Sequence, residues 1–296
     1  MATIDRVAVI GTGRMGGAMV GTLRSAGYDV MVYNRSTGKA EAVAEATGAT
    51  VAATPAEAAR SARIVLSSLA DDRAVIDTHT GLDGTITGLG SDSVLVETST
   101  IDPQTLHSIE PAVSAQGATL LDGPVSGSVP LVEQGKLTFM VGGNAETLET
   151  VRPVLDSLSA KIFHVGDLGA GATIKLAVNA IVISTNVALA EALVLAERSG
   201  VDRQTAYEVF AGSAAASPFV AYKQAAFVSP ENAPVAFSAE LVLKDLGLIL
   251  SLGRSVGVPM EQGEANLAVT EQAVQAGYGD KDMSAVASYL RERATG

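Results

Sequence analysis

A lysine and two asparagines recur at helical spacing in a strongly apolar stretch of the chain, between Gly169 and Gly200. The stretch is rich in helix-forming residues, lacks proline and has glycine at both ends, which predicts one long helix. At 3.6 residues per turn, Lys175, Asn179 and Asn186 share a face whose other residues are aliphatic. A buried charge is costly unless it has a partner. We therefore interpret this face as one wall of a ligand site.

A membrane span is the alternative interpretation of the same helix. No residue from Leu176 to Ala190 is charged. That run is shorter than the roughly 20 residues that a bilayer requires. It also contains Ser184, Thr185 and asparagines. The composition therefore favours a core helix between two halves of a soluble protein.

A glycine-rich turn follows the first apolar stretch of the chain. Residues 6–10 have the β-branched pattern of a buried parallel strand, and residues 17–24 have helical periodicity. Between them, a G-x-G-x-x-G pattern provides a tight turn, a close approach to a pyrophosphate and close packing of helix on strand. The pattern predicts a dinucleotide site at Gly11, Thr12, Gly13, Arg14, Met15 and Gly16.

The second predicted strand, Asp29–Tyr33, ends in Asn34, Arg35 and Ser36. Sites for NAD usually carry a carboxylate here, which accepts a hydrogen bond from the ribose 2′-hydroxyl. That carboxylate is missing, and the guanidinium of Arg35 could instead bind a 2′-phosphate. Arg35 could also be an ordinary exposed charge. The missing acid favours NADPH over NAD.

Strands and helices alternate as far as residue 165, after which only helical patterns remain. This order predicts an α/β fold with a doubly wound parallel sheet of six to nine strands in residues 1–165. An all-helical domain would then occupy residues 166–296. Polar loops follow the strands that end near residues 69 and 97. In such sheets these loops lie at the edge where ligands bind.

Composition excludes several classes of protein. The net charge of −12 argues against nucleic acid or an anionic membrane as the main partner. The chain has no cysteine, its three histidines lack metal-ligand spacing, and its N-terminus does not resemble a signal peptide. We expect a cytoplasmic protein without a metal site. The apolar C-terminal helices indicate a homodimer or homotetramer.

Four separated motifs together resemble the β-hydroxyacid dehydrogenase family, which includes 3-hydroxyisobutyrate dehydrogenases and glyoxylate/succinic semialdehyde reductases. They are the glycine turn Gly11–Gly16, the segment Asp122–Ser128, the segment Gly169–Asn179, and the pair Lys244-Asp245. The resemblance covers nearly the whole chain. It implies a Rossmann domain, a long interdomain helix and an all-helical domain.

The resemblance also implies roles for individual residues. Lys175 would be catalytic, with Asn179 helping to anchor the substrate, and Lys244 would lie near the nicotinamide. The substrate carboxylate would be held by Ser126, Gly127 and Ser128, and the cofactor would also be lined by Leu69, Ala70 and Thr100. Ser128 and the Asn34-Arg35 pair look most like the glyoxylate/succinic semialdehyde branch. Ala70 departs from the proline that is common in the family.

These residues suit the reduction of a small aldehyde-acid by NADPH. Hydride transfer to an aldehyde builds negative charge on its oxygen, and an ammonium can stabilise that charge and donate the proton. An imine reductase is one alternative, because such enzymes share the architecture, but they usually lack a lysine at the position of Lys175. A non-catalytic NADP-binding sensor is the other. It should have lost Ser126, Lys175 or Asn179, and none is lost.

Overall fold

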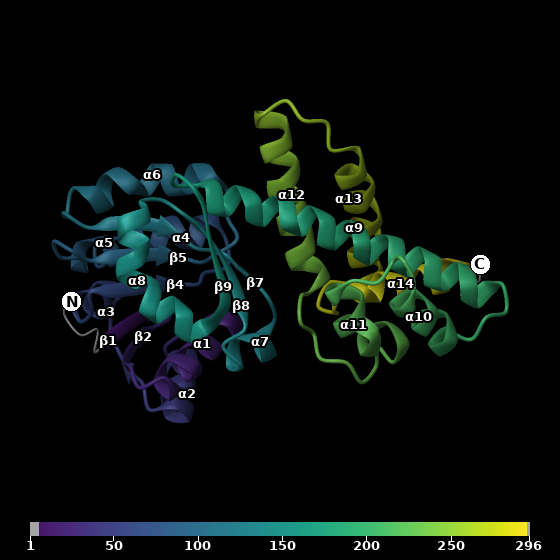
Figure 1. Cartoon of the computed structure of the whole chain (residues 1–296), viewed down its shortest axis with the longest axis horizontal. Helices are drawn as coiled ribbons and strands as arrows, with labels where there is room; N and C mark the ends of the chain where they lie inside the picture. Colours follow the sequence, from purple (N-terminus) through teal and green to yellow (C-terminus); the bar gives the residue numbers. More distant parts are fainter. Residues whose placement is uncertain (1–5, 295–296) are drawn as a thin grey trace. The chain divides into compact units, whose positions relative to one another are not determined.

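Short apolar strands build one sheet in the first part of the chain (Figure 1). The structure is a computed structural model that describes residues 6–294, and it divides into two units, one ending at Lys175 and the other beginning at Leu176. The strands are β1 (Arg6–Ile10), β2 (Asp29–Tyr33), β3 (Thr50–Val51), β4 (Ile64–Ser67), β5 (Val94–Glu97), β6 (Thr119–Asp122), β7 (Val125–Ser126), β8 (Leu137–Gly142) and β9 (Ser159–Gly166). The order β3-β2-β1-β4-β5-β6, parallel throughout, confirms the predicted doubly wound parallel sheet for these six strands.

The sheet is mixed at its far edge rather than parallel throughout. Strand β8 runs antiparallel to β6 and β7, and β9 is parallel to β8. The connection 127–136 between β7 and β8 is shorter than the dozen or so residues that a parallel crossover needs. The segment expected as a substrate loop therefore contains a short strand, in which Ser126 pairs with Thr138.

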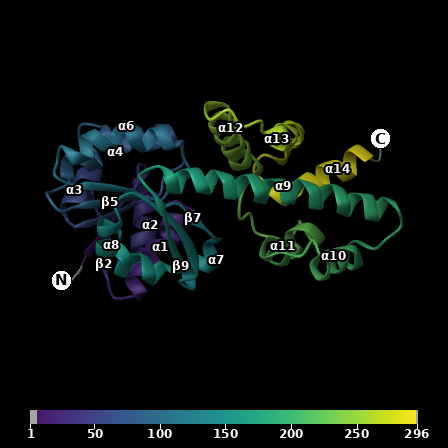
Figure 2. The ribbon, with the colours of Figure 1, turned by 45° about the horizontal axis from the view of Figure 1, so that its top comes forward.

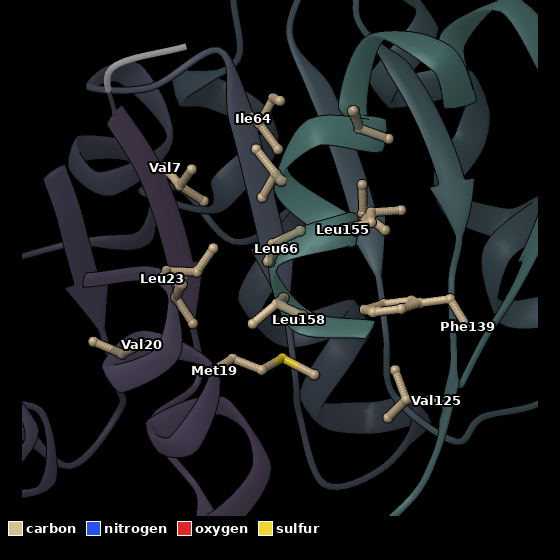
Figure 3. Packing of buried hydrophobic residues seen from close by; sticks show 14 of the residues in the cluster. Val7, Met19, Val20, Leu23, Ile64, Leu66, Val125, Phe139, Leu155 and Leu158 are labelled. Carbon is tan, nitrogen blue, oxygen red and sulfur yellow. The ribbon is translucent and has the colours of Figure 1, made fainter. Parts of the chain in front are cut away.

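Helices cover both faces of the sheet. One face carries α1 (Arg14–Ser25), α2 (Thr37–Thr47), α7 (Val129–Glu133) and α8 (Ala145–Leu158). The other carries α3 (Pro55–Arg60), α4 (Asp72–Thr80), α5 (Thr85–Gly88) and α6 (Pro103–Ser114). Figure 3 shows side chains of α1, the strands and α8, such as Met19, Leu66 and Leu158, pointing into the first of these cores. The two apolar cores, one on each face, fix the parallel strands so that their carboxyl ends lie at one edge of the sheet.

The second unit is helical in the part of the chain that the structure describes. Its helices are the C-terminal part of α9 (Ala170–Arg198), α10 (Arg203–Gly212), α11 (Pro218–Val228), α12 (Ala239–Ser255), α13 (Glu261–Ala273) and α14 (Val286–Ala294). Figure 2 shows α12 and α13 on one side of α9 and α10 and α11 on the other. Helix α11 begins at Pro218, because the side chain of Ser217 caps it and proline suits the first turn of a helix.

Helix α9 has 29 residues, and its mean hydropathy reaches 1.8 over 18 residues, so it could cross a membrane by length and composition. The uncharged run is only part of the helix, and length alone therefore does not exclude a span. Hydrogen bonds favour the core interpretation instead. Within the helical unit, Asn186 donates to the carbonyl of Met283 at 2.9 Å, and Ser184 accepts from Asn266 at 2.9 Å. Asn186 and Ser184 of α9 are thus bonded to other segments of the helical unit.

Candidate functional site

The turn between β1 and α1 is shaped by glycines. Gly11 adopts a φ of +96°, and a Cβ there would overlap the carbonyl oxygen of Ser68. A Cβ on Gly16 would in turn overlap the carbonyl oxygen of Gly11. Gly13 faces open space and caps α1 without any side-chain hydrogen bond. Gly13 and Arg14 at the start of α1 are exposed. A helix N-terminus that follows such a turn suits a pyrophosphate.

Asn34 links this turn to the end of β2. Its Oδ1 accepts from the backbone N–H of Thr12 at 3.1 Å, and its Nδ2 donates to the carbonyl of Ser36 at 3.0 Å. Arg35 and Ser36 are exposed beside it. The structure thus brings the two predicted cofactor segments together at one edge of the sheet. The side chain of Asn34 thus joins the turn after β1 to the loop after β2 by hydrogen bonds. The sequence pattern did not indicate this role.

The loops after β4 and β5 lie at the same edge. The backbone N–H of Leu69 donates to the Oγ of Ser99 at 2.7 Å, which joins the loop carrying Ala70 to the loop carrying Thr100. Glu97 organises this contact, because its Oε1 accepts from the N–H of Ser99 at 2.8 Å. Both loops are therefore held by hydrogen bonds at the carboxyl ends of their strands.

Glu97 also contacts a histidine. Its Oε2 lies 2.8 Å from Nε2 of His79 on α4, and both side chains are fully buried. His79 therefore pairs with Glu97 inside the first unit. The sequence signal for this pair is slight. It consists of an acidic residue at the end of an otherwise apolar strand.

The substrate segment after β6 is tightly packed. Gly127 has a φ of +145°, and a Cβ there would lie 2.6 Å from a methyl group of Leu137. Ser126 and Ser128 on either side of it are half-buried. Residues other than glycine would fit this turn poorly. Gly127 thus allows the turn that separates Ser126 from Ser128.

The first turn of α9 is attached to the end of β6. Asp122, which is 1% exposed, accepts hydrogen bonds from the N–H groups of Gly169 and Ala172 at 2.8 and 2.7 Å. Lys175, three residues after Ala172, is half-buried. Asn179 follows Lys175 by four residues on the same helix, so the predicted helical spacing of these two residues is confirmed.

In the helical unit, Asn179 is tied to the Lys244-Asp245 pair. Its Nδ2 donates to Oδ2 of Asp245 at 2.6 Å, and Oδ1 of the same carboxylate lies 3.0 Å from Nζ of Lys244. Asp245 is 2% exposed, whereas the Lys244 side chain is 25% exposed. The pair is therefore not an ordinary surface ion pair. Asp245 orients Asn179 and Lys244 together, a role that the sequence did not reveal.

A second ion pair of the helical unit was also not predicted. Nζ of Lys223 on α11 lies 2.7 and 2.8 Å from the two carboxylate oxygens of Asp282, and both residues are buried. Burial alone would raise the pKa of Asp282. The ammonium of Lys223 and hydrogen bonds from the backbone outweigh burial and lower the pKa of Asp282 below its usual value. This pair fixes α11 to the segment before α14.

Two family models match consecutive parts of the chain. One, described as the NAD binding domain of 6-phosphogluconate dehydrogenase, matches residues 6–166. The other, described as NAD-binding of NADP-dependent 3-hydroxyisobutyrate dehydrogenase, matches residues 169–290. Together they cover both structural units.

Similar proteins share the full length of the chain. The mitochondrial 3-hydroxyisobutyrate dehydrogenase of Drosophila melanogaster is 32% identical over 97% of this chain and 89% of its own length. The 3-sulfolactaldehyde reductase of Escherichia coli is 32% identical, covering 97% and 96%. The chloroplastic glyoxylate/succinic semialdehyde reductase 2 of Arabidopsis thaliana is 32% identical, covering 96% and 79%.

Solved structures show the same architecture. Mycobacterium tuberculosis 3-hydroxyisobutyrate dehydrogenase with L-serine superimposes with a TM-score of 0.85 at 28% identity, covering 98% of this chain and 100% of that one. An imine reductase from a Pseudomonas species has a TM-score of 0.67 at 22% identity, covering 97% and 100%, which shows a shared fold alone.

Proposed function

We propose that this chain interconverts a small aldehyde-acid and its hydroxy-acid with NADPH. The proposal starts from the family, because the chain belongs to the β-hydroxyacid dehydrogenases and is an oxidoreductase acting on CH–OH groups. The observation that carries the proposal is the placement of Lys175. It follows one turn after the start of α9, and this helix start is bonded to the unit that contains the dinucleotide-type glycine turn.

The residues of that unit fit a nicotinamide dinucleotide. Gly13 is open, the start of α1 has no side-chain cap, and the buried Oγ1 of Thr12 has no hydrogen-bond partner among the described residues. When bound, the reduced cofactor supplies the hydride. The ammonium of Lys175 would stabilise the charge that develops on the aldehyde oxygen and donate its proton there.

The other residues would bind and orient the substrate. Hydroxyl and backbone donors of Ser126, Gly127 and Ser128 suit a carboxylate. The buried carboxylate of Asp245 holds both the side chain of Asn179 and the ammonium of Lys244 in the helical unit. By the resemblance to the family, Asn179 would help to anchor the substrate and Lys244 would act at the cofactor. This assignment favours a small acid, of the kind named in the semialdehyde reductases that the chain resembles.

A substrate panel tests the proposal. The full-length protein would be assayed by NADPH and NADH oxidation with glyoxylate, succinic semialdehyde and other small aldehyde-acids, and with a cyclic imine. Turnover of an aldehyde-acid well above that of its uncharged aldehyde analogue is expected. Preference for the cyclic imine would support an imine reductase instead, and tight NADPH binding without turnover would support a sensor.

Arg35→Ala tests the cofactor preference. Loss of a charge-assisted contact to a 2′-phosphate should weaken NADPH binding by about 10- to 100-fold and leave NADH binding nearly unchanged. Both dissociation constants can be measured by fluorescence titration. Arg60→Ala is a matched control, because this exposed arginine ends α3 just before the amino end of β4. Equal weakening of both cofactors by Arg35→Ala would refute the role of Arg35.

We also propose a cytoplasmic homodimer or homotetramer. On α9, Ile181 and Leu195 are 69% and 70% exposed, and they lie two heptads apart on the same side of the helix. A second copy of the chain could cover this stripe. Light scattering at several protein concentrations measures the oligomer order, and a monomer at all of them would exclude it.

A further inference from the structure

Asp122 caps the helix that carries Lys175. Gly169 has no side chain with which to cap α9, and its carbonyl accepts the first intrahelical bond, from Thr173. The carboxylate of Asp122 performs that role from a strand 47 residues earlier, accepting from Gly169 and Ala172. A negative group also suits the positive end of the helix dipole. Two of the first amides of α9 thus depend on one buried side chain.

The surroundings of the carboxylate leave it little freedom. A Cβ on Gly142 of β8 would overlap Oδ1 of Asp122, and a Cβ on Gly171 would lie 2.7 Å from its Oδ2. Both glycines therefore allow the strand and the helix to approach the carboxylate closely. The first turn of α9 has a single tightly packed position against β6 and β8.

Burying the carboxylate of Asp122 costs free energy, because the charged group loses its contact with water. Burial raises the pKa of Asp122, although hydrogen bonds from the backbone of Gly169 and Ala172 act in the opposite direction. A helix start could be capped by a neutral serine or asparagine without burying a charge. Starting helix α9 therefore does not by itself require a buried carboxylate at Asp122.

We propose that Asp122 is a positioning residue for the reaction, an inference that rests on the proposed function. It fixes Lys175, about one turn beyond Ala172, relative to the substrate segment Asp122–Ser128, of which Asp122 is the first residue. The peptide of Gly123 is itself fixed, since its N–H donates to the carbonyl of Glu97 at 2.8 Å. One residue thus connects the proton donor to the carboxylate-binding turn.

Asp122→Asn tests this role, because an amide nitrogen cannot accept the second hydrogen bond. A misplacement of about 1 Å can lower turnover by about 100-fold, so we expect kcat to fall by roughly 10- to 100-fold. The dissociation constant for NADPH should stay within about twofold, because α1 and its glycine turn are untouched. Hydrogen exchange measured by mass spectrometry should accelerate in residues 168–175 and not in α1.

Asp202→Asn is the matched control, since Asp202 caps α10 by accepting from Thr205 at 3.0 Å. It should leave kcat unchanged. Asp122→Ser, which is smaller and neutral, serves if the asparagine variant does not fold. The proposal is overturned if kcat stays within threefold of wild type, if kcat and NADPH binding fall in parallel, or if neither variant folds. A wild-type protein that reduces no aldehyde-acid would instead refute the proposed function.

Discussion

Replacing Lys175 with alanine should lower turnover of the preferred aldehyde-acid by about three orders of magnitude or more, through loss of proton donation and of charge stabilisation. Binding of NADPH should change little, because the glycine turn that suits its pyrophosphate lies on β1 and α1. Steady-state kinetics and cofactor titration of the same preparation measure both quantities. A variant that keeps a tenth of the wild-type rate would show that Lys175 is not the acid.

Two further variants make the result specific to the ammonium at this position. Lys161→Ala removes an exposed lysine of β9 in the same unit and should leave the rate unchanged. Lys175→Arg keeps the positive charge but is a much weaker proton donor near neutral pH. It should therefore recover part of the charge stabilisation and remain well below wild type.

The second large effect expected is on stability. Lys223→Met should lower the free energy of unfolding by about 3–5 kcal/mol, because it leaves the buried carboxylate of Asp282 without its cation. Urea denaturation followed by circular dichroism measures this loss. Lys281→Met is the control, since the Lys281 side chain is 59% exposed and lies 3.6 Å from an exposed Asp280 carboxylate. Its effect should stay below about 1 kcal/mol.

The same pair gives stability a defined pH dependence. The pKa of Asp282 is lowered in the folded chain from its usual value of 3.8. The ion pair therefore contributes its full stability above about pH 4, and that contribution is lost as the pH falls through the lowered folded-state pKa. Wild type should lose stability more steeply than Lys223→Met below pH 4. Parallel curves for the two proteins would contradict this account.

Local sequence signals predicted much of the fold. Close contacts require glycine at Gly11 and Gly16. Their spacing, together with the strand before them and the helix after them, indicates the turn. The start of α9 after Gly169 follows from glycine and helical periodicity in the same way. Periodicity also separated the strands from the helical region after residue 166.

Contacts between distant residues were not predictable in this way. Asp122 accepts from an amide 47 residues later, and Asp245 accepts from Asn179, which lies 66 residues earlier. Lys223 and Asp282 are 59 residues apart. A single carboxylate in an apolar sequence does not reveal which amide or ammonium it meets, since that depends on the packing of whole elements. The antiparallel edge of the sheet was missed because β7 has only two residues, Val125 and Ser126, and lies in a segment that was expected to be a loop.

The cap on α9 determines where this chain can be divided. A fragment that stops at residue 166 would keep every strand but would lose Gly169 and Ala172. The carboxylate of Asp122 on β6 would then lose both of the amides that donate to it. The first unit extends to Lys175, beyond the last strand. Cofactor-binding halves exchanged between relatives should therefore be joined inside the long helix, downstream of its first turn, rather than in the loop that precedes it.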